Sequence, residues 1–140
     1  MAGSDTQPAD HLEVALVAAE RTVWSGQAKI VIARTTDGDV GILPGHEPVL
    51  AILVPGAVEV FTADNTREVI AVDGGFISVA HGRVSILSEH AALAEEVSLR
   101  DAEKELAAAQ ARLDRGDDDE DTRQHFALAS AQVRAAEKLQ

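Results

Sequence analysis

The stretch Gly41-Ile42-Leu43-Pro44-Gly45-His46-Glu47-Pro48 brings two prolines and two glycines together within eight residues. Proline fixes φ and lacks a backbone donor, and glycine adopts positive φ, so this combination predicts a rigid corner between two apolar segments. His46 lies inside that corner. Because functional residues concentrate on loops held by a rigid scaffold, we expect the corner to be a contact surface as well as a connection.

The segments on both sides of this corner, from Leu12 to Leu87, have the pattern of short β-strands. Apolar residues alternate with polar ones, and β-branched residues are frequent. Turn signals recur at short intervals, at Asp37-Gly38, Pro55-Gly56, Asp64-Asn65, Asp73-Gly74-Gly75 and His81-Gly82. Many short strands without an intervening helix predict a β-sandwich or flattened barrel and disfavour a parallel βαβ arrangement.

After Glu89 the apolar residues recur at steps of three and four, which is the period of a helix. The first helical stripe comprises Leu99, Ala102, Leu106, Ala109 and Leu113, and the second comprises Phe126, Ala129, Val133 and Ala136. Both stripes are rich in alanine, and a short polar loop between two helices favours an antiparallel pair. The sequence therefore predicts an α+β protein in which a helical hairpin follows a β domain.

The ends of these helices are also predictable. Ser98 with Asp101 resembles a capping box and predicts the start of the first helix. Arg112 and Arg115 followed by Gly116 predict its end, because cations suit the C-terminal end and glycine suits the left-handed position after it. The acidic run at 117–121 is expected to be a solvated loop, with Asp121 or Thr122 capping the second helix.

We expect three regions along the chain. Residues 1–10 are polar and are expected to be disordered, residues 11–90 to form the β-sandwich, and residues 91–140 to form the hairpin domain. The start of the chain lacks the pattern of a secretory signal, and no apolar run approaches the roughly 20 residues that cross a bilayer. We therefore expect a soluble, intracellular chain.

Composition excludes several classes of partner and chemistry. The net charge of −12 disfavours nucleic acid and anionic membrane surfaces, since binding to phosphates depends on Lys and Arg. There is no cysteine, which removes disulfides and thiolate metal sites. The five histidines, at positions 11, 46, 81, 90 and 125, lack metal-ligand spacing. We expect no metal, no cofactor and no catalytic residue.

The order of the motifs is similar to that of the epsilon subunit of bacterial F-type ATP synthase. The resemblance depends on the run from Gly41 to Pro48 and extends to Leu12-Glu13-Val14, Val23-Trp24-Ser25-Gly26, Pro55-Gly56, Asp73-Gly74-Gly75-Phe76 and the alanine-rich hairpin. It covers essentially Leu12 to Leu139. It implies a sandwich of about ten strands, followed by two helices.

The resemblance also implies a function and partners. Members of this family lie on the central stalk, bind the gamma subunit and the membrane c-ring, and couple proton flow to ATP synthesis on other subunits. Their C-terminal helices can inhibit ATP hydrolysis, with the alpha and beta subunits as further partners. The expected location is the cytoplasmic face of the cell membrane, reached only through the complex. By motif position, the c-ring-facing residues would be Asp39, Gly41, Pro44, Gly45 and His46.

Some family members bind ATP through an Ile/Leu-Asp-x-x-Arg-Ala motif at the start of the first helix. Here the corresponding residues include Val97, Ser98, Asp101 and Ala102, so that serine replaces the acid and aspartate replaces the arginine. Arg100 is shifted by one position, a turn of about 100° on a helix. The resemblance therefore implies weak or no ATP binding.

Two other functions remain open from the sequence. One is a cupin-like metal enzyme, for which His46 beside Glu47 would be a ligand, although neighbouring histidines at close spacing are missing. The other is a generic adaptor whose hairpin docks onto a partner helix.

Overall fold

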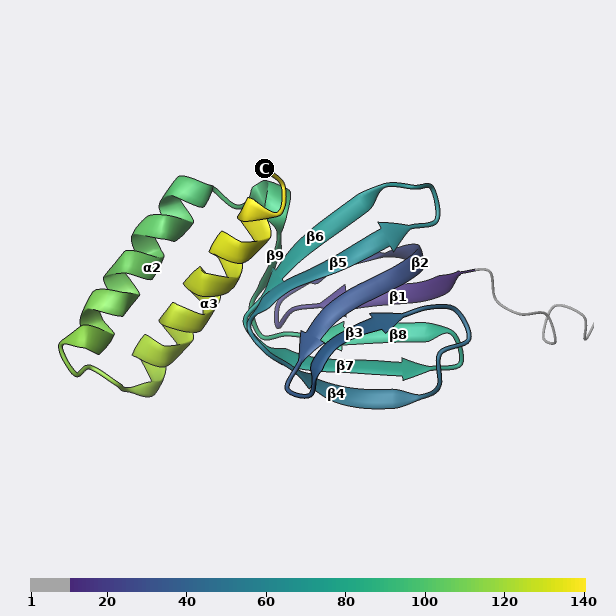
Figure 1. Ribbon diagram of the computed structural model, residues 1–140, viewed down its shortest axis with the longest axis horizontal. Helices are drawn as coiled ribbons and strands as arrows, with labels where there is room; N and C mark the ends of the chain where they lie inside the picture. Colours follow the sequence, from purple (N-terminus) through teal and green to yellow (C-terminus); the bar gives the residue numbers. More distant parts are fainter. Residues whose placement is uncertain (1–10) are drawn as a thin grey trace, which may run out of the picture.

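Alternating apolar side chains organise the β domain in this computed structural model, which describes residues 11–140 (Figure 1). The segment expected to be disordered, 1–10, lies outside the described residues. The strands are β1 (Leu12–Val17), β2 (Thr22–Thr35), β3 (Gly38–Ile42), β4 (Val49–Leu53), β5 (Gly56–Thr62), β6 (Arg67–Val72), β7 (Gly75–Ala80), β8 (Arg83–Leu87) and β9 (Ala91–Leu93).

Hydrogen bonding joins these nine strands in the order β1-β8-β7-β4-β2-β5-β6-β9, with β3 beside β2 and a further pairing between β1 and β2. The long strand β2 pairs with β1 in its first half and with β3 in its second half, so it takes part in both layers of the sandwich. The expected sandwich is confirmed, with nine described strands where about ten were expected. The parallel pairing of β1 with β8 was not predicted.

The core lies between the two layers and consists of aliphatic side chains. Its largest fully buried members include Leu12, Leu16, Ile42, Ile70, Ile77 and Ile86. On β5 the alternation is complete, since Val58 and Val60 are buried and their neighbours Ala57 and Glu59 are partly exposed. Burial of aliphatic surface at about 25 cal/mol per Å² is the main stabilising contribution in a domain of this kind.

The turn between β6 and β7 requires glycine after Asp73. Gly75 has φ of +110°, and a Cβ at this position would lie 1.8 Å from the carbonyl oxygen of Leu87. The carboxylate of Asp73 accepts hydrogen bonds from the Ser88 hydroxyl (2.9 Å) and from the backbone N–H of His90 (3.1 Å). The turn is therefore fastened to the segment that leads out of β8.

That segment continues the sheet beyond the boundary expected at residue 90. Strand β9 (Ala91–Leu93) pairs with β6, with Ala92 opposite Ala71. A 3₁₀ helix, η1 (Ala94–Glu96), follows it directly. Because Asp73 holds His90 against the sheet, the chain remains in register with β6 for three more residues before it leaves.

The two expected helices are α2 (Leu99–Asp114) and α3 (Glu120–Glu137). The predicted cap is confirmed, because Ser98 Oγ accepts a hydrogen bond from the Asp101 N–H (3.2 Å). The predicted stop is confirmed too. Gly116 has φ of +90°, its N–H bonds to the Leu113 carbonyl, and the next N–H bonds to Arg112, which is a Schellman ending.

The expected cap of the second helix was wrong. Asp119 is extended and its side chain accepts a hydrogen bond from the Thr122 N–H (2.8 Å), so the helix begins at Glu120. An aspartate that can bond the N–H three positions later caps a helix well, and Asp119 is the first residue of the run to do so. Asp121 and Thr122 are therefore inside the first turn.

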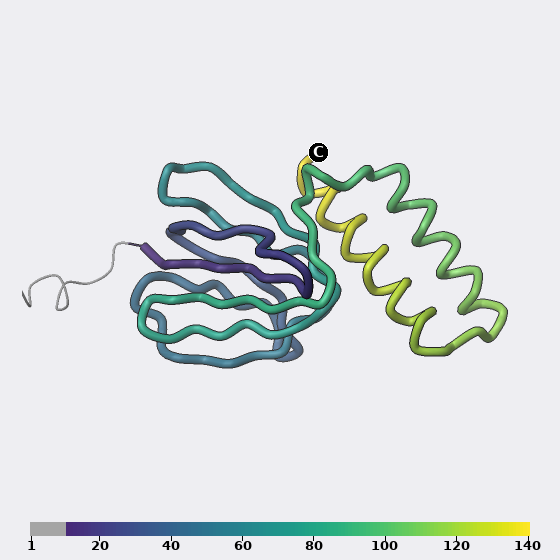
Figure 2. The backbone as a smooth tube through the Cα atoms, turned by 180° about the vertical axis from the view of Figure 1, so that it is seen from behind, coloured from purple at the N-terminus to yellow at the C-terminus, as the bar shows by residue number. Residues whose placement is uncertain are grey.

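The hairpin touches the sandwich through one helix. Figures 1 and 2 show α3 between α2 and the strands. Helix α3 packs on β5, β6 and η1, whereas α2 packs mainly on α3. None of the helices in residues 11–140 combines the length and apolar character that a membrane span needs.

Candidate protein-interaction surfaces

The corner between β3 and β4 contains a tight turn. The N–H of His46 bonds to the carbonyl of Leu43 (3.0 Å), and Gly45 has φ of +88°. Proline at the second position and a positive φ at the third define a type II turn. A Cβ at Gly45 would meet no atom within 4 Å, so the turn projects away from the rest of the chain. Pro44, Gly45 and His46 thus form one small, rigid projection.

His46 makes a local contact inside this corner. Its Nδ1 lies 2.6 Å from the carbonyl oxygen of Glu47, so Nδ1 carries the proton and donates it. Within residues 11–140 no three His, Asp or Glu side chains gather as metal ligands. The His46 ring is held by the backbone carbonyl of the next residue, Glu47.

Asp39 lies at the opposite end of β3 from this turn. Its Oδ1 accepts a hydrogen bond from Arg34 Nε (2.9 Å), and the bond and the charge of Asp39 raise the pKa of Arg34. Asp39 also lines a cavity of about 400 Å³ with Arg134 of α3 and with Lys138, which follows that helix. The structure therefore does not bring together all five residues expected to face the c-ring. It separates Asp39 from the turn by the length of the strand, with Gly41 between them.

A row of apolar side chains, three exposed and one half-buried, crosses four strands on the outer face of the sandwich. The sheet register places Ile52 of β4 opposite Phe76 of β7, Phe76 opposite Leu87 of β8, and Leu87 beside Val17 of β1. The exposed fractions are 53% for Ile52, 51% for Phe76 and 56% for Leu87. Apolar side chains grouped in this way mark interaction surfaces more often than scattered ones do. We call these four residues the apolar row.

The apolar row was not predicted, although the sequence around Phe76 carries part of the signal. Phe76 and Ile77 are adjacent on a strand and so point to opposite faces. Ile77 is fully buried, so Phe76 must face outward. The register that joins Phe76 to Ile52 and Leu87 depends on long-range pairing and is not visible in the local pattern.

The start of α2 carries the residues that correspond to the ATP motif. Val97 and Ser98 precede the helix, Asp101 is exposed in its first turn, and Ala102 is buried. The exposed Arg100 lies next to Asp101 in sequence and hence on a different side of the helix. In the helix, Arg100 therefore does not take the place of the motif's arginine, which Asp101 occupies.

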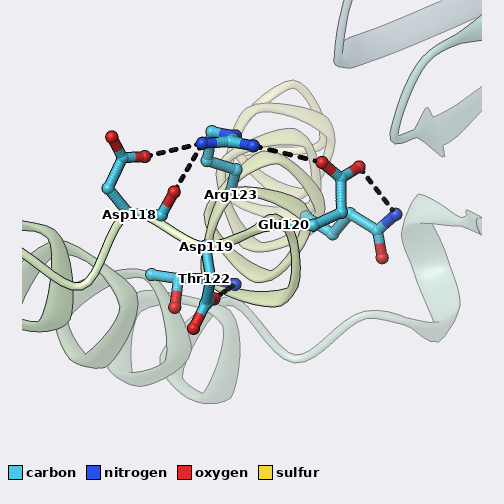
Figure 3. Close-up of polar contacts among 6 residues, drawn as sticks. Asp118, Asp119, Glu120, Thr122 and Arg123 are labelled. Atoms are coloured by element: carbon cyan, nitrogen blue, oxygen red, sulfur yellow. Dashed lines mark hydrogen bonds and ion pairs between the residues drawn. The ribbon is translucent and has the colours of Figure 1, made fainter.

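The acidic loop is organised around the start of α3 (Figure 3). Arg123 forms ion pairs with Asp118 (2.6 Å) and Glu120 (3.2 Å), and Asp119 caps the helix. Thr122, through its side chain and then its backbone N–H, lowers the pKa of Asp119. The loop is exposed, as expected, and also acts as the cap of α3.

The chain thus combines a β-sandwich that carries an exposed apolar row with an antiparallel helical hairpin. This arrangement is typical of a protein that acts by binding other proteins. The family described as the ATP synthase Delta/Epsilon chain, beta-sandwich domain, matches residues 11–94. The chain is similar to the ATP synthase epsilon chain of Streptomyces avermitilis, with 51% identity over 106 residues, which covers 76% of this chain and 86% of the relative. It is also similar to that of Cutibacterium acnes, with 42% identity over 137 residues, 91% of this chain and 94% of the relative.

A solved structure shares the fold. A chain of the Euglena gracilis mitochondrial ATP synthase, in a structure of OSCP, F1 and the c-ring, matches with a TM-score of 0.74 and 24% identity, covering 96% of this chain and 84% of that one. The present chain belongs to the family of ATP synthase delta/epsilon chains.

Proposed function

We propose that this chain is the epsilon subunit of the central stalk of a bacterial F-type ATP synthase. In this role it has no active site; it binds gamma and the c-ring and couples proton flow to ATP synthesis on other subunits. It is peripheral at the cytoplasmic face of the cell membrane and reaches the membrane only through the complex. The observation that carries the proposal is the exposed apolar row on a domain that belongs to this family.

The apolar row is the proposed contact with gamma. Ile52, Phe76 and Leu87 are each more than half exposed, and they lie side by side on adjacent strands. Covering them with a partner surface removes a continuous apolar strip from water, whereas covering isolated side chains does not. Phe76 is central in the row and should carry the largest share of the affinity.

Binding of purified gamma to Phe76→Asp tests this contact. We expect the affinity to fall by tenfold or more, with the circular dichroism spectrum unchanged because Phe76 is exposed. Leu43→Asp is the matched control, since Leu43 is 55% exposed on the same domain but lies outside the row. Equal binding by both variants and the unsubstituted chain would contradict the proposal.

The c-ring contact is proposed along β3 and its two ends. Asp39 and Gly41 lie on the strand, and Pro44, Gly45 and His46 lie in the turn after it. The chain has no cysteine, so Asp39→Cys and His46→Cys each create a unique attachment point for a photoreactive group. In the assembled complex we expect both to crosslink to the c-ring. Crosslinking at only one would confine the contact to that end, and crosslinking at neither would exclude β3.

The hairpin is proposed to regulate ATP hydrolysis by moving away from the sandwich toward gamma and the alpha and beta subunits. Its small buried side chains support a weak attachment. Deleting the residues after Leu93 should raise ATP hydrolysis by the whole complex. Unchanged hydrolysis would argue against an inhibitory role.

We also propose that this subunit does not bind ATP at residues 97–102. Ser98 is committed to capping α2, and Asp101 places a carboxylate in the first turn where a phosphate would have to approach. Calorimetric titration of ATP and magnesium should give no micromolar complex. A micromolar, magnesium-sensitive complex would refute this point.

A further inference from the structure

The apolar contact between α3 and the sandwich is made of small side chains. Its buried members are Val69, Ala71, Ala94, Ala131 and Ala135. A buried methyl group removes far less area from water than a buried Leu or Ile, and hydrophobic stabilisation follows area. Alanine surfaces are also smooth, so they define the position of the helix along the strands poorly. Some other interaction must fix where α3 docks.

A charged cluster at the C-terminal end of α3 can fix the position of the helix on the strands. Arg67 of β6 donates from Nε (3.0 Å) and Nη2 (2.6 Å) to Glu59 Oε1 on the neighbouring strand β5. Its third group, Nη1, donates to the backbone carbonyl of Lys138 at the end of α3 (3.2 Å). Lys138 Nζ in turn lies 3.6 Å from Glu59 Oε2. One guanidinium therefore bridges the sandwich and the end of the helix.

We propose that Glu59, Arg67 and Lys138 form an ionic latch that holds the hairpin against the sandwich. The planar guanidinium holds its donors in a rigid fork, so two can bond Glu59 while a third reaches the Lys138 carbonyl, whereas the compact ammonium of lysine lacks this fixed geometry. A cation beside the last carbonyls of a helix also interacts favourably with the helix dipole. The Glu59 side chain is only 15% exposed, so its attraction to both cations is incompletely screened by water.

The latch is built to be released. The side chains of Arg67 and Lys138 are 36% and 43% exposed, so salt or a charged partner can compete for them. When the hairpin leaves, Arg67 keeps its bonds to Glu59, and only the bonds to Lys138 are lost. Detachment therefore leaves no buried charge unpaired in the sandwich. The effect of the latch on ATP hydrolysis rests on the proposed function, but its effect on the isolated chain does not.

Arg34 provides a matched control. It forms the same kind of bond, from Nε to Asp39 at 2.9 Å, but both partners belong to the sandwich. Arg34 also lines the cavity beside the end of α3, but among the described residues its side chain bonds only to Asp39, so removing it should leave the docking of α3 unchanged. Arg67→Lys keeps the charge of Arg67 and removes the planar fork, so it separates geometry from charge.

Amide hydrogen exchange on the isolated full chain tests the latch. In Arg67→Ala we expect the amides of α3 and of its contact strand β6 to exchange roughly 5- to 30-fold faster, which corresponds to the loss of one or two modest interactions. The buried amides of β7 should stay protected. Arg67→Lys should be intermediate, and Arg34→Ala should match the unsubstituted chain. Raising the salt concentration should reduce the difference between Arg67→Ala and the unsubstituted chain.

Two results would overturn the latch. One is exchange in α3 of Arg67→Ala equal to that of Arg34→Ala. The other is equal acceleration in β7, which would mean that Arg67 holds the sandwich itself. Glu59→Gln tests separately whether the charge of Glu59 holds the hairpin, because it keeps the size of the side chain and removes its charge. Since these measurements use the isolated chain, their outcome is separate from whether the hairpin inhibits ATP hydrolysis.

Discussion

The sandwich and the hairpin bury different kinds of side chain. The sandwich core is filled by Leu, Ile and Val, many of them fully buried. Within α2 and α3 the buried residues are alanines and one threonine. The same chain therefore contains a domain with a large apolar core and an attached unit held by small contacts and a few charges. Because, within residues 11–140, the sandwich core contains no side chain of the hairpin helices, we expect the sandwich to stay folded if the hairpin changes position.

The largest expected effect comes from the turn that closes the sandwich. Gly75→Ala should lower the free energy of unfolding by about 4 kcal/mol or more, because the added Cβ meets the Leu87 carbonyl at 1.8 Å and φ is positive. Urea unfolding followed by circular dichroism measures it. Gly41→Ala is the control, since its Cβ would have only an ordinary contact with Ile30 at 3.8 Å. Similar losses in both variants would contradict this account of Gly75.

The next prediction compares the two regions directly. Ile70→Ala should cost about 2–5 kcal/mol, because Ile70 is fully buried in the sandwich core and the substitution leaves a cavity. Leu106→Ala in α2 should cost less than about 1.5 kcal/mol, since Leu106 is only half-buried. Urea unfolding of both variants gives the two numbers. Equal costs would show that the hairpin is as firmly packed as the sandwich.

Loss of the α2 cap should have a smaller effect, confined to the stability of the hairpin. Ser98→Ala removes the cap of α2 and should cost about 1 kcal/mol, seen as faster amide exchange in the first turns of α2. Strands β5 and β7 should be unaffected. Ser78→Ala, on an exposed position of β7, is the control. Faster exchange throughout the sandwich of Ser98→Ala would mean that the two regions are tightly coupled.

The smallest effect concerns pH. Thr122 first, and the charges of Arg112 and Arg123 less strongly, hold the pKa of Asp119 below its ordinary value of 3.8. A carboxylate with a lowered folded pKa contributes its full stability above the unfolded pKa and loses it as pH falls through the folded pKa. Amide exchange at the start of α3, corrected for its intrinsic pH dependence, should therefore reveal loosening as the pH falls below the ordinary pKa of 3.8. Asp119→Asn, which caps without titrating, should loosen less; an identical pH response would exclude Asp119 as the cause.

Local signals made much of the fold predictable. Alternation placed the strands, Gly116 and Ser98 set the limits of α2, and the alanine stripes placed the contact between the helices. These features depend on residues within a few positions of each other. The cap of α3 was misplaced by two or three positions because five consecutive acidic residues at 117–121 offer nearly equivalent choices.

Long-range features were not predictable from one sequence. Ala131 and Ala135 form a second buried face on α3, but alanine is so common there that the face has no distinct pattern. The separation of Asp39 from His46 follows from the direction of β3, and the apolar row follows from strand register. Each depends on pairings between segments far apart in the chain.

The pairing of β1 with β8 has a consequence for how the protein is made. It places Glu13 opposite Arg83, 70 positions further along the chain. Closing so long a loop costs entropy before any contact is gained, and folds with many such pairings fold slowly. During synthesis β1 emerges from the ribosome first and must wait for β8 before its second edge is covered. Until then it pairs only with β2, so its other edge, with unpaired N–H and C=O groups, is open to pairing with another strand.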